Sequence, residues 1–375
     1  MEPSAETFQD KKMNTIESLF KDGVMEMATY SPIEPPDQIA LRLGIPESKI
    51  IKLDANENPY GVAPEVLTEL GQAKYLSIYP DPAQKAIRQS IAEYVGCTAE
   101  NIVAGAGADE LIDLICRLVL NPGDKVLTFT PTFSYYKHVV ELNGGEFVDV
   151  ERNPDYSINK QGLPALDMKG IKIVLLCSPN NPPGNMLEED VLRFFLDKDM
   201  LVVVDEAYYE FSRSTYAGRI QQHNNLIVLR TFSKCFGLAG LRVGYGIMST
   251  VLQGAIMKIK PPYSVNMAAE VALKVCMEKK ELFANQVDTM IATRDRVIEA
   301  LKKRDELEVY PSHSNFILMR IKTVSAKELR DAMEQQGILL RYFNTPQLKN
   351  HLRVSVGTED QMDIFLSTFI GLLEN

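Results

Sequence analysis

Residues 200–209, MLVVVDEAYY, place the apolar run Leu-Val-Val-Val directly before an acid, Asp205. An apolar run without polar alternation is typical of a β-strand that is buried on both faces. Similar runs recur along the chain, separated mostly by helical segments, at 101–107, 125–131, 171–180, 225–234 and 241–247. Strands that alternate with helices favour right-handed crossovers, so the sequence predicts an α/β domain with a mostly parallel sheet.

Three regions are predicted along the chain. Residues 1–48 form an N-terminal arm that packs on the small domain and on a partner subunit, with a helix that begins at Pro36 and ends at Gly44. Residues 49–265 form the large α/β domain. Residues 266–375 form a small α+β domain, whose last helix begins with a capping box of Thr358 and Gln361.

The composition narrows the class of protein. The formal net charge is −10 and no run of basic residues is longer than three, which disfavours nucleic acid or an anionic membrane as the main partner. Five scattered cysteines form no CxxC pair and favour reduced thiols. The first residues lack the apolar core of a signal peptide, and no apolar run reaches about 18 residues. We therefore expect a soluble cytoplasmic protein.

In an open α/β sheet, ligands bind beyond the carboxyl ends of the strands, so the residues after each apolar run are candidate site residues. Residues 105–112, GAGADELI, are a small-residue turn that enters an amphipathic helix, whose first N–H groups can hold a phosphate. A dinucleotide site is an alternative, but Glu110 stands where its third glycine is expected.

The other strand ends carry an amide, a carboxylate and an amine. Asn180 and Asn181 lie in SPNNPPGN, residues 178–185, which can equally be an ordinary turn. Asp205 needs a partner if it is buried, unless it serves as a helix N-cap. Lys234 follows the last of these runs, and hydroxyls and a guanidinium lie near it in sequence, at Thr231, Ser233 and Arg242. Together these groups are what pyridoxal 5′-phosphate (PLP) requires.

The motifs SPNNPPG (178–184), DEAY (205–208) and TFSKCFGLAGLRVGYG (231–246), in this order, resemble the signatures of fold-type I PLP-dependent aminotransferases. With LDANENPYG (53–61), YPD (79–81), GAGADELI and LRVSVGT (352–358), the chain resembles the histidinol-phosphate aminotransferases, which belong to the class II subfamily of that fold type, over about residues 30–370. The resemblance implies an aspartate-aminotransferase-like fold. Its large PLP-binding domain has a mostly parallel seven-stranded sheet covered by helices, and its second domain is smaller and α+β.

The resemblance also implies roles at the cofactor ring. Lys234 would form the Schiff base and move the substrate proton, and Asp205 would keep the pyridine nitrogen protonated. Asn181 and Tyr208 would donate to the ring oxygen. Phe133, in PTF (131–133), would stack on the ring face, where many relatives have Tyr.

For the cofactor phosphate, the resemblance implies the backbone N–H groups of Ala108 and Asp109 and the side chains of Thr231, Ser233 and Arg242. Asp109 has an alternative role, the stabilisation of its own helix N-terminus. Tyr60 corresponds to a tyrosine that reaches the cofactor phosphate of the neighbouring subunit, so a homodimer is expected.

For the substrate, Arg353 matches the arginine that clamps the α-carboxylate of glutamate, and it would meet the phosphate of histidinol phosphate. Arg341 and Tyr30 stand where the family adds phosphate contacts, and Asn181 is a further substrate-side residue. A strand-edge arginine and a packed tyrosine are the alternatives for Arg341 and Tyr30. Glu34 replaces a basic residue that relatives often have, a departure that weakens the phosphate assignment.

The function implied is reversible amino transfer between L-histidinol phosphate and 2-oxoglutarate, giving imidazole-acetol phosphate and L-glutamate, in histidine biosynthesis. An aromatic amino acid aminotransferase or a threonine-phosphate decarboxylase on the same scaffold stays open. A PLP-binding regulator without turnover is disfavoured, because the acidic chain has no spare segment for a DNA-binding domain. The four histidines fall in none of these motifs, and no metal site is expected.

Overall fold

The structure of the protein is a computed structural model that describes residues 16–21, 23–27 and 34–374. The chain divides into two units, residues 1–32 and 33–375. In the first unit the described residues form two 3₁₀ helices, η1 (Ile16–Leu19) and η2 (Val24–Glu26). Tyr30, predicted to contact the substrate phosphate, lies outside the described residues.

The second unit is built on a seven-stranded sheet, as the sequence analysis predicted. The strands lie in the order β2-β8-β7-β6-β5-β3-β4, and every neighbouring pair is parallel except the two pairs that include β8. Residues 201–205 of the stretch MLVVVDEAYY form β6, in the middle of the sheet between β7 and β5. The strands are β2 (Ile102–Gly105), β3 (Lys125–Thr130), β4 (Glu146–Glu151), β5 (Ile171–Cys177), β6 (Leu201–Asp205), β7 (Leu226–Thr231) and β8 (Gly244–Met248).

Six of these strands coincide with the apolar runs, and β4 does not. Its sequence EFVDVE alternates apolar and polar residues. β4 is an edge strand with no residue fully buried, so alternation is the pattern its position requires.

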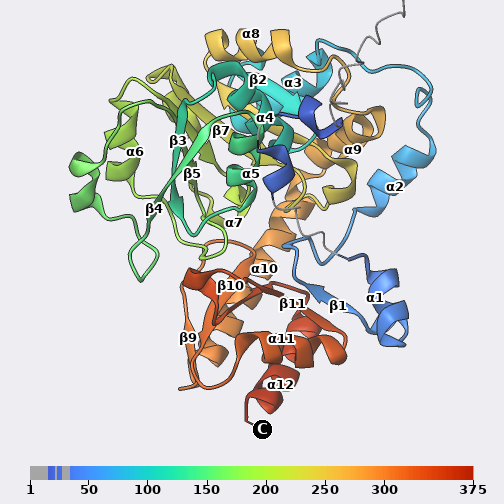
Figure 1. Ribbon diagram of the computed structural model, residues 1–375. Helices are drawn as coiled ribbons and strands as arrows, with labels where there is room; N and C mark the ends of the chain where they lie inside the picture. Colours follow the sequence, from blue (N-terminus) through green and yellow to red (C-terminus); the bar gives the residue numbers. More distant parts are fainter. Residues whose placement is uncertain (1–15, 22, 28–33, 375) are drawn as a thin grey trace, which may run out of the picture. The chain divides into compact units, whose positions relative to one another are not determined.

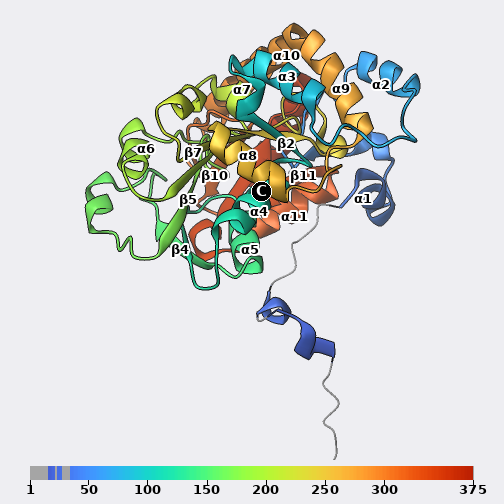
Figure 2. The same ribbon diagram turned by 90° about the horizontal axis from the view of Figure 1, so that it is seen from above.

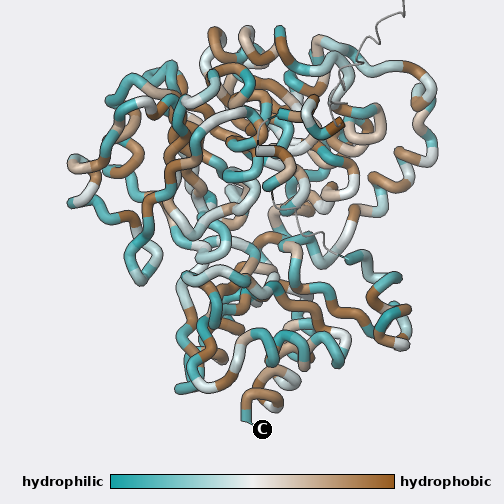
Figure 3. Tube along the Cα trace, viewed as in Figure 1, coloured by the Kyte–Doolittle hydropathy of each residue, from teal (hydrophilic) through white to brown (hydrophobic). Residues whose placement is uncertain are grey.

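Helices cover both faces of this sheet (Figures 1 and 2). One face is covered by α4 (Ala108–Val119), α5 (Tyr135–Leu142) and α8 (Thr250–Ile259). The opposite face is covered by α2 (Pro64–Gly71), α3 (Lys85–Val95), α6 (Glu189–Leu196), α9 (Met267–Glu278) and part of α10 (Lys280–Leu301). In Figure 3 the hydrophobic segments lie mainly in the interior, along the strands.

A second, five-stranded sheet has the order β1-β11-β12-β10-β9. Its strands are β1 (Ile51–Leu53), β9 (Leu307–Val309), β10 (Phe316–Ile321), β11 (Ile338–Tyr342) and β12 (His351–Ser355), and it packs with α11 (Ala326–Gln335) and α12 (Glu359–Leu373). The boundary predicted at residue 49 places β1 with the large domain, whereas β1 pairs with β11. Only three residues long, β1 gave no apolar run that could reveal this partner.

Local start and stop signals hold where they were predicted. Helix α1 (Pro36–Leu43) has Pro36 in its first turn and ends at Gly44 with a φ of 67°. Helix α12 begins with the capping box of Thr358 and Gln361. The remaining elements are α7 (Tyr209–Ser212), η3 (Glu47–Lys49), η4 (Ala99–Asn101), η5 (Lys160–Ala165), η6 (Ala217–Gln221), η7 (Ala239–Leu241) and η8 (Pro346–Leu348).

All five cysteines are free thiols. Within the ranges described above, none of the helices has the length and hydrophobicity needed to cross a membrane.

Candidate active site

The central strands deliver three polar side chains to one edge of the large sheet. β5, β6 and β7 are parallel neighbours, so their carboxyl ends share that edge. Asp205 is the last residue of β6, and Asn181 and Lys234 follow β5 and β7 within a few residues. The structure therefore brings together the amide, carboxylate and amine predicted from the sequence.

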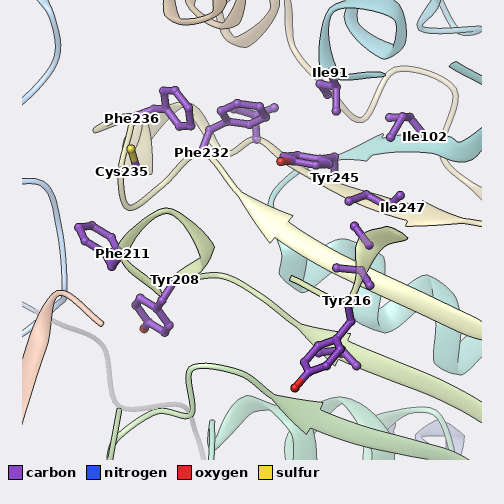
Figure 4. Close-up of a cluster of buried hydrophobic side chains, with 14 of the residues drawn as sticks. Ile91, Ile102, Tyr208, Phe211, Tyr216, Phe232, Cys235, Phe236, Tyr245 and Ile247 are labelled. Carbon is purple, nitrogen blue, oxygen red and sulfur yellow. The ribbon is translucent and has the colours of Figure 1, made fainter. Parts of the chain in front are cut away.

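Lys234 lies on a loop that is anchored by aromatic side chains. Phe232 and Phe236 are buried with their ring centroids 5.0 Å apart, and Cys235 is buried beside them (Figure 4). Lys234 Nζ donates a hydrogen bond of 3.0 Å to the carbonyl oxygen of Ala55. Burial of the ammonium group, and after it the positive charge of Arg353, lower the pKa of Lys234 to about 8.

The carboxylate of Asp205 is 5% exposed. It accepts hydrogen bonds from the Tyr136 hydroxyl at 2.7 Å and from the backbone N–H of Ala207 at 3.0 Å. Burial raises the pKa of Asp205 to about 6. Asp205 is not a helix N-cap, the alternative role, because α7 begins at Tyr209 and its cap position is Tyr208.

A chain of hydrogen bonds links Tyr208 to the second sheet. Asn181 Nδ2 donates to the Tyr208 hydroxyl oxygen at 3.3 Å, while Asn181 Oδ1 accepts from Arg353 Nη1 at 2.6 Å. Arg353 Nη2 donates to the carbonyl oxygen of Asp54 at 2.6 Å, and its guanidinium lies 5.3 Å from the ring centroid of Phe316. The two sheets therefore meet at these side chains.

The N-terminus of α4, at Gly107 and Ala108, lies against Arg242 and Gly244 near the start of β8 and close to the end of β7, and we call this group of residues the cradle. Its N-cap, Gly107, has a φ of 86° and makes no side-chain cap hydrogen bond. A Cβ at Gly107 would lie 2.5 Å from Arg242 Nη2, and one at Gly244 would lie 2.6 Å from the backbone nitrogen of Ala108. Both glycines are therefore required for this close approach.

Hydroxyl groups and two charged side chains complete the cradle. Thr231 Oγ1 donates to Ser233 Oγ at 3.0 Å, and Arg242 Nη1 lies 3.4 Å from Ser233 Oγ. Asp109 Oδ2 accepts from Arg242 Nη2 at 3.0 Å. The carboxylate of Asp109 thus holds the arginine, and it lies in the first turn of α4, where a negative charge also stabilises the helix N-terminus.

Phe133 packs against Tyr136, the residue that donates to Asp205. Its ring centroid is 5.5 Å from that of Tyr136, at 88°, and Tyr136 donates to Asp205. Because Phe133 has no hydroxyl, its side chain can contact a ligand only through its aromatic ring.

Two predicted residues lie outside this network. Arg341, on β11, is directly opposite Arg353 of β12 in the antiparallel register. Tyr60 is 38% exposed, and its backbone N–H donates to the side-chain oxygen of Asn58 at 2.9 Å.

Two residues that were not predicted from the sequence contact the predicted ones. Tyr136 donates to Asp205, and Asn56 Nδ2 donates to the Tyr208 hydroxyl oxygen at 3.0 Å. Asn56 lies in LDANENPYG, one of the motifs that carry the resemblance, but the resemblance implied no role for this residue. Tyr136 is a helix residue in α5, and nothing in the sequence marks it.

Comparison with known proteins decides the family. The sequence model for aminotransferase class I and II matches residues 48–369. The chain belongs to the class I and II aminotransferases. A chloroplastic histidinol-phosphate aminotransferase from Nicotiana plumbaginifolia is 40% identical to this aminotransferase and covers 97% of it, with 89% of the relative covered.

Bacterial proteins are equally similar. The histidinol-phosphate aminotransferase of Dehalococcoides mccartyi (strain ATCC BAA-2266) is 42% identical, covering 90% of this aminotransferase and 93% of the relative. The crystal structure of histidinol-phosphate aminotransferase from Sinorhizobium meliloti, in complex with pyridoxal-5′-phosphate, has a TM-score of 0.85 at 26% identity. That match covers 95% of this aminotransferase and 98% of the bacterial chain.

The cofactor of this aminotransferase is PLP, and the residues of the site fit it. The open N-terminus of α4 beside Arg242 suits a phosphate, and a cation such as a protonated pyridine would keep the buried carboxyl of Asp205, whose pKa is raised, ionised. The lowered pKa of Lys234 suits an amine that attacks an aldehyde. Among the described residues, no group of three His, Cys, Asp or Glu side chains is arranged to hold a metal ion.

Proposed function

We propose that this aminotransferase transfers the amino group of L-glutamate to imidazole-acetol phosphate, reversibly, giving L-histidinol phosphate and 2-oxoglutarate in histidine biosynthesis. The observation that carries the proposal is the pairing of Arg341 with Arg353 on adjacent strands, with Arg353 bonded to Asn181 at the catalytic edge. Relatives at about 40% identity that bear the name of this activity support it.

The proposed cofactor phosphate site consists of backbone and side-chain donors. The first N–H groups of α4, at Ala108 and Asp109, would bind its oxygens together with the hydroxyls of Thr231 and Ser233. Arg242 would supply the positive charge, and its bond to Asp109 keeps the guanidinium in place.

When bound, PLP supplies an aldehyde that takes up the amino group and a ring that accepts the electron pair released at the substrate Cα. Asp205 would hold a proton on the ring nitrogen, and that cation would in turn keep the buried carboxylate ionised. Tyr208 and Asn181 would donate to the ring oxygen, and Phe133 would cover the ring face.

Lys234 would hold the cofactor covalently and then move the proton from the substrate Cα. A base must be neutral to accept this proton, and a pKa of about 8 leaves roughly a tenth of the amine neutral near pH 7. The Ala55 carbonyl oxygen, 3.0 Å from Nζ, fixes one of the directions in which the amine can donate.

The two arginines would bind the distal anion of each substrate. Residues directly opposite on antiparallel strands present their side chains on one face, and the guanidiniums of Arg341 and Arg353 lie 5.9 and 5.8 Å from the ring centroid of Phe343. Two adjacent positive charges suit a phosphate dianion better than one does. The same pair would also meet a carboxylate of glutamate, consistent with one site for both substrates.

The test is the loss of the cofactor's aldehyde absorbance on mixing the PLP-loaded enzyme with one amino donor at a time. Histidinol phosphate and glutamate are expected to convert the cofactor to its amine form, and 2-oxoglutarate to restore it. Phenylalanine and threonine phosphate serve as competitors. Fast conversion by phenylalanine, or carbon dioxide release from threonine phosphate, with none from histidinol phosphate, would contradict the proposal.

We also propose that the two sheets are the cores of a large and a small domain, and that the enzyme is a cytoplasmic homodimer. Free cysteines are compatible with a reducing compartment. Exposed apolar side chains follow Tyr60 in the sequence, at Leu67, Tyr75, Leu76, Ile78 and Tyr79. They support a protein interface in this part of the chain.

Subunit mixing tests the shared site. Inactive Lys234→Ala and Tyr60→Phe homodimers, once mixed and exchanged, would form heterodimers with one intact site if Tyr60 serves the partner. Recovered activity supports the proposal, and none after proven exchange contradicts it.

A further inference from the structure

Three consecutive residues, Asp54, Ala55 and Asn56, each contact a different proposed active-site side chain. The carbonyl oxygen of Asp54 accepts from Arg353 at 2.6 Å, and that of Ala55 accepts from Lys234 at 3.0 Å. The side chain of Asn56 donates to Tyr208 at 3.0 Å. This short segment joins β1 of the second sheet to the part of the chain that leads to α2, so it passes between the two sheets.

Asn56 is the fixed point of the segment. It is 1% exposed and has a φ of 56°, in the left-handed region that Asn and Gly tolerate best. Its N–H donates to Ser355 Oγ at 2.8 Å, and its Oδ1 accepts from Ser355 Oγ at 2.9 Å. Its carbonyl oxygen accepts from Asn315 Nδ2 at 3.0 Å. Each backbone polar group and each side-chain polar atom of Asn56 is therefore used.

These bonds determine which way the Asn56 amide faces. Because Oδ1 is held by Ser355, the Nδ2 group faces Tyr208. Asn181 is oriented in the same manner, because Arg353 holds its Oδ1 and turns its Nδ2 toward Tyr208. The Tyr208 oxygen thus accepts two N–H donors. A phenolic oxygen has capacity for about two accepted bonds, so its own proton must point to a third partner.

We propose that Asn56 is a positioning residue that, with Asn181, fills the acceptor capacity of the Tyr208 hydroxyl and thereby directs the Tyr208 proton toward the cofactor. The proposal rests on the proposed function only in that PLP occupies this site. It adds that a residue outside the motifs for the cofactor decides the direction in which Tyr208 donates. Ser355 of β12 and Asn315, directly before β10, hydrogen-bond to Asn56, so the second sheet also helps to determine the direction in which Tyr208 donates.

The test compares Asn56→Gly with Asn56→Asp. Glycine accepts the left-handed backbone and removes the amide, whereas aspartate keeps the size and replaces the Nδ2 donor with an acceptor. If Asn56 only filled space, aspartate would be the milder change. If it directs the Tyr208 proton, aspartate is the more harmful one, because the hydroxyl would turn to donate to the new carboxylate.

The main readout is the pH midpoint of the visible absorbance of the bound cofactor, measured without substrate. Both Asn56 variants are expected to shift the midpoint in the direction that Tyr208→Phe shifts it. The shift should be larger for Asn56→Asp than for Asn56→Gly. In a Tyr208→Phe background, Asn56→Gly should add almost no shift. We expect kcat to fall roughly 10-fold for Gly and further for Asp, with KM for histidinol phosphate within about two-fold.

Controls separate this role from a structural one. Asn101→Asp changes an equally buried amide that donates to the Met248 carbonyl oxygen at 2.8 Å, and it should lower the melting temperature without a spectral shift. If the Asn56 variants do not fold, Ser355→Ala removes the group that orients the amide and should shift the midpoint in the same direction. Equal shifts from Asn56→Gly in both Tyr208 backgrounds, or a smaller effect of Asp than of Gly, would overturn the proposal. A parent enzyme that binds PLP but ignores histidinol phosphate would overturn only the proposed substrate.

Discussion

Arg341 and Arg353 lie directly opposite each other on the antiparallel strands β11 and β12. Like charges in this arrangement repel, by roughly 0.2–1 kcal/mol for a cross-strand pair. Arg353 is 6% exposed, and it donates hydrogen bonds to neutral oxygens of Asn181 and Asp54. We propose that this pair of positive charges receives the phosphate of the substrate.

Replacement of Arg341 tests that arrangement. Arg341→Gln is expected to raise KM for histidinol phosphate by roughly 10- to 100-fold, the worth of one charged hydrogen bond. The effect on glutamate should be smaller, because a carboxylate carries less charge than a phosphate dianion. Steady-state kinetics with each donor measures both. Arg320→Gln is the control, since Arg320 pairs with Glu308 on the exposed side of the same sheet. Equal KM changes for the two donors would contradict a phosphate role.

Gly107 offers a second prediction. Gly107→Ala would place a Cβ 2.5 Å from Arg242 Nη2, so the guanidinium must leave the cradle. The affinity for PLP, measured by absorbance, is expected to fall roughly 10-fold or more. Gly96→Ala is the control for a positive φ, because Gly96 has a φ of 81° but open space around its Cβ. Gly107→Ala should lose more stability from backbone strain, because the ψ of Gly107 is 169° and that of Gly96 is 38°, and only Gly107→Ala should lose affinity for PLP.

The large sheet was predictable because its inner strands are buried on both faces and read as unbroken apolar runs. Its site was predictable where a polar residue follows such a run, as Asp205 follows β6. β1 could not be placed, since three residues carry no periodic signal and their partner β11 lies 285 or more positions away in sequence. Asn56 and Tyr136 act through contacts between distant segments, which spacing along the chain cannot reveal.

Asp205 predicts how the cofactor-free enzyme responds to pH. Its pKa is about 6 in the folded chain and 3.8 as the ordinary value, so folding favours the protonated form. Stability is then present below pH 3.8 and is lost as the pH rises through 6, by at most about 3 kcal/mol. Asp205→Asn, which avoids this loss, should melt higher than the parent at pH 8 when PLP is absent, and by a diminishing margin toward pH 4.

The same variant should behave in the opposite way once PLP is present. The proposed pyridinium cation compensates the buried carboxylate of the parent, and asparagine cannot keep that ring nitrogen protonated. Differential scanning calorimetry of both proteins, with and without PLP, checks the crossover. A parent that is more stable than Asp205→Asn at pH 8 without PLP would show that the hydrogen bonds from Tyr136 and Ala207 outweigh the cost of burying the carboxylate.

Lys234 predicts how fast the enzyme takes up its cofactor. Only the neutral amine attacks an aldehyde, and burial gives Lys234 a pKa of about 8 in place of 10.5. Covalent attachment of PLP to the cofactor-free enzyme should therefore accelerate roughly 10-fold per pH unit below about pH 7 and become level above about pH 9. Borohydride trapping at timed intervals, with the modified peptide identified by mass spectrometry, measures the rate. Lys234→Arg keeps a positive charge and should fold, yet it should give no trapped peptide at any pH. A rate that keeps rising to pH 10 would mean that the amine titrates as an ordinary exposed lysine, in which case burial does not prepare it for the reaction.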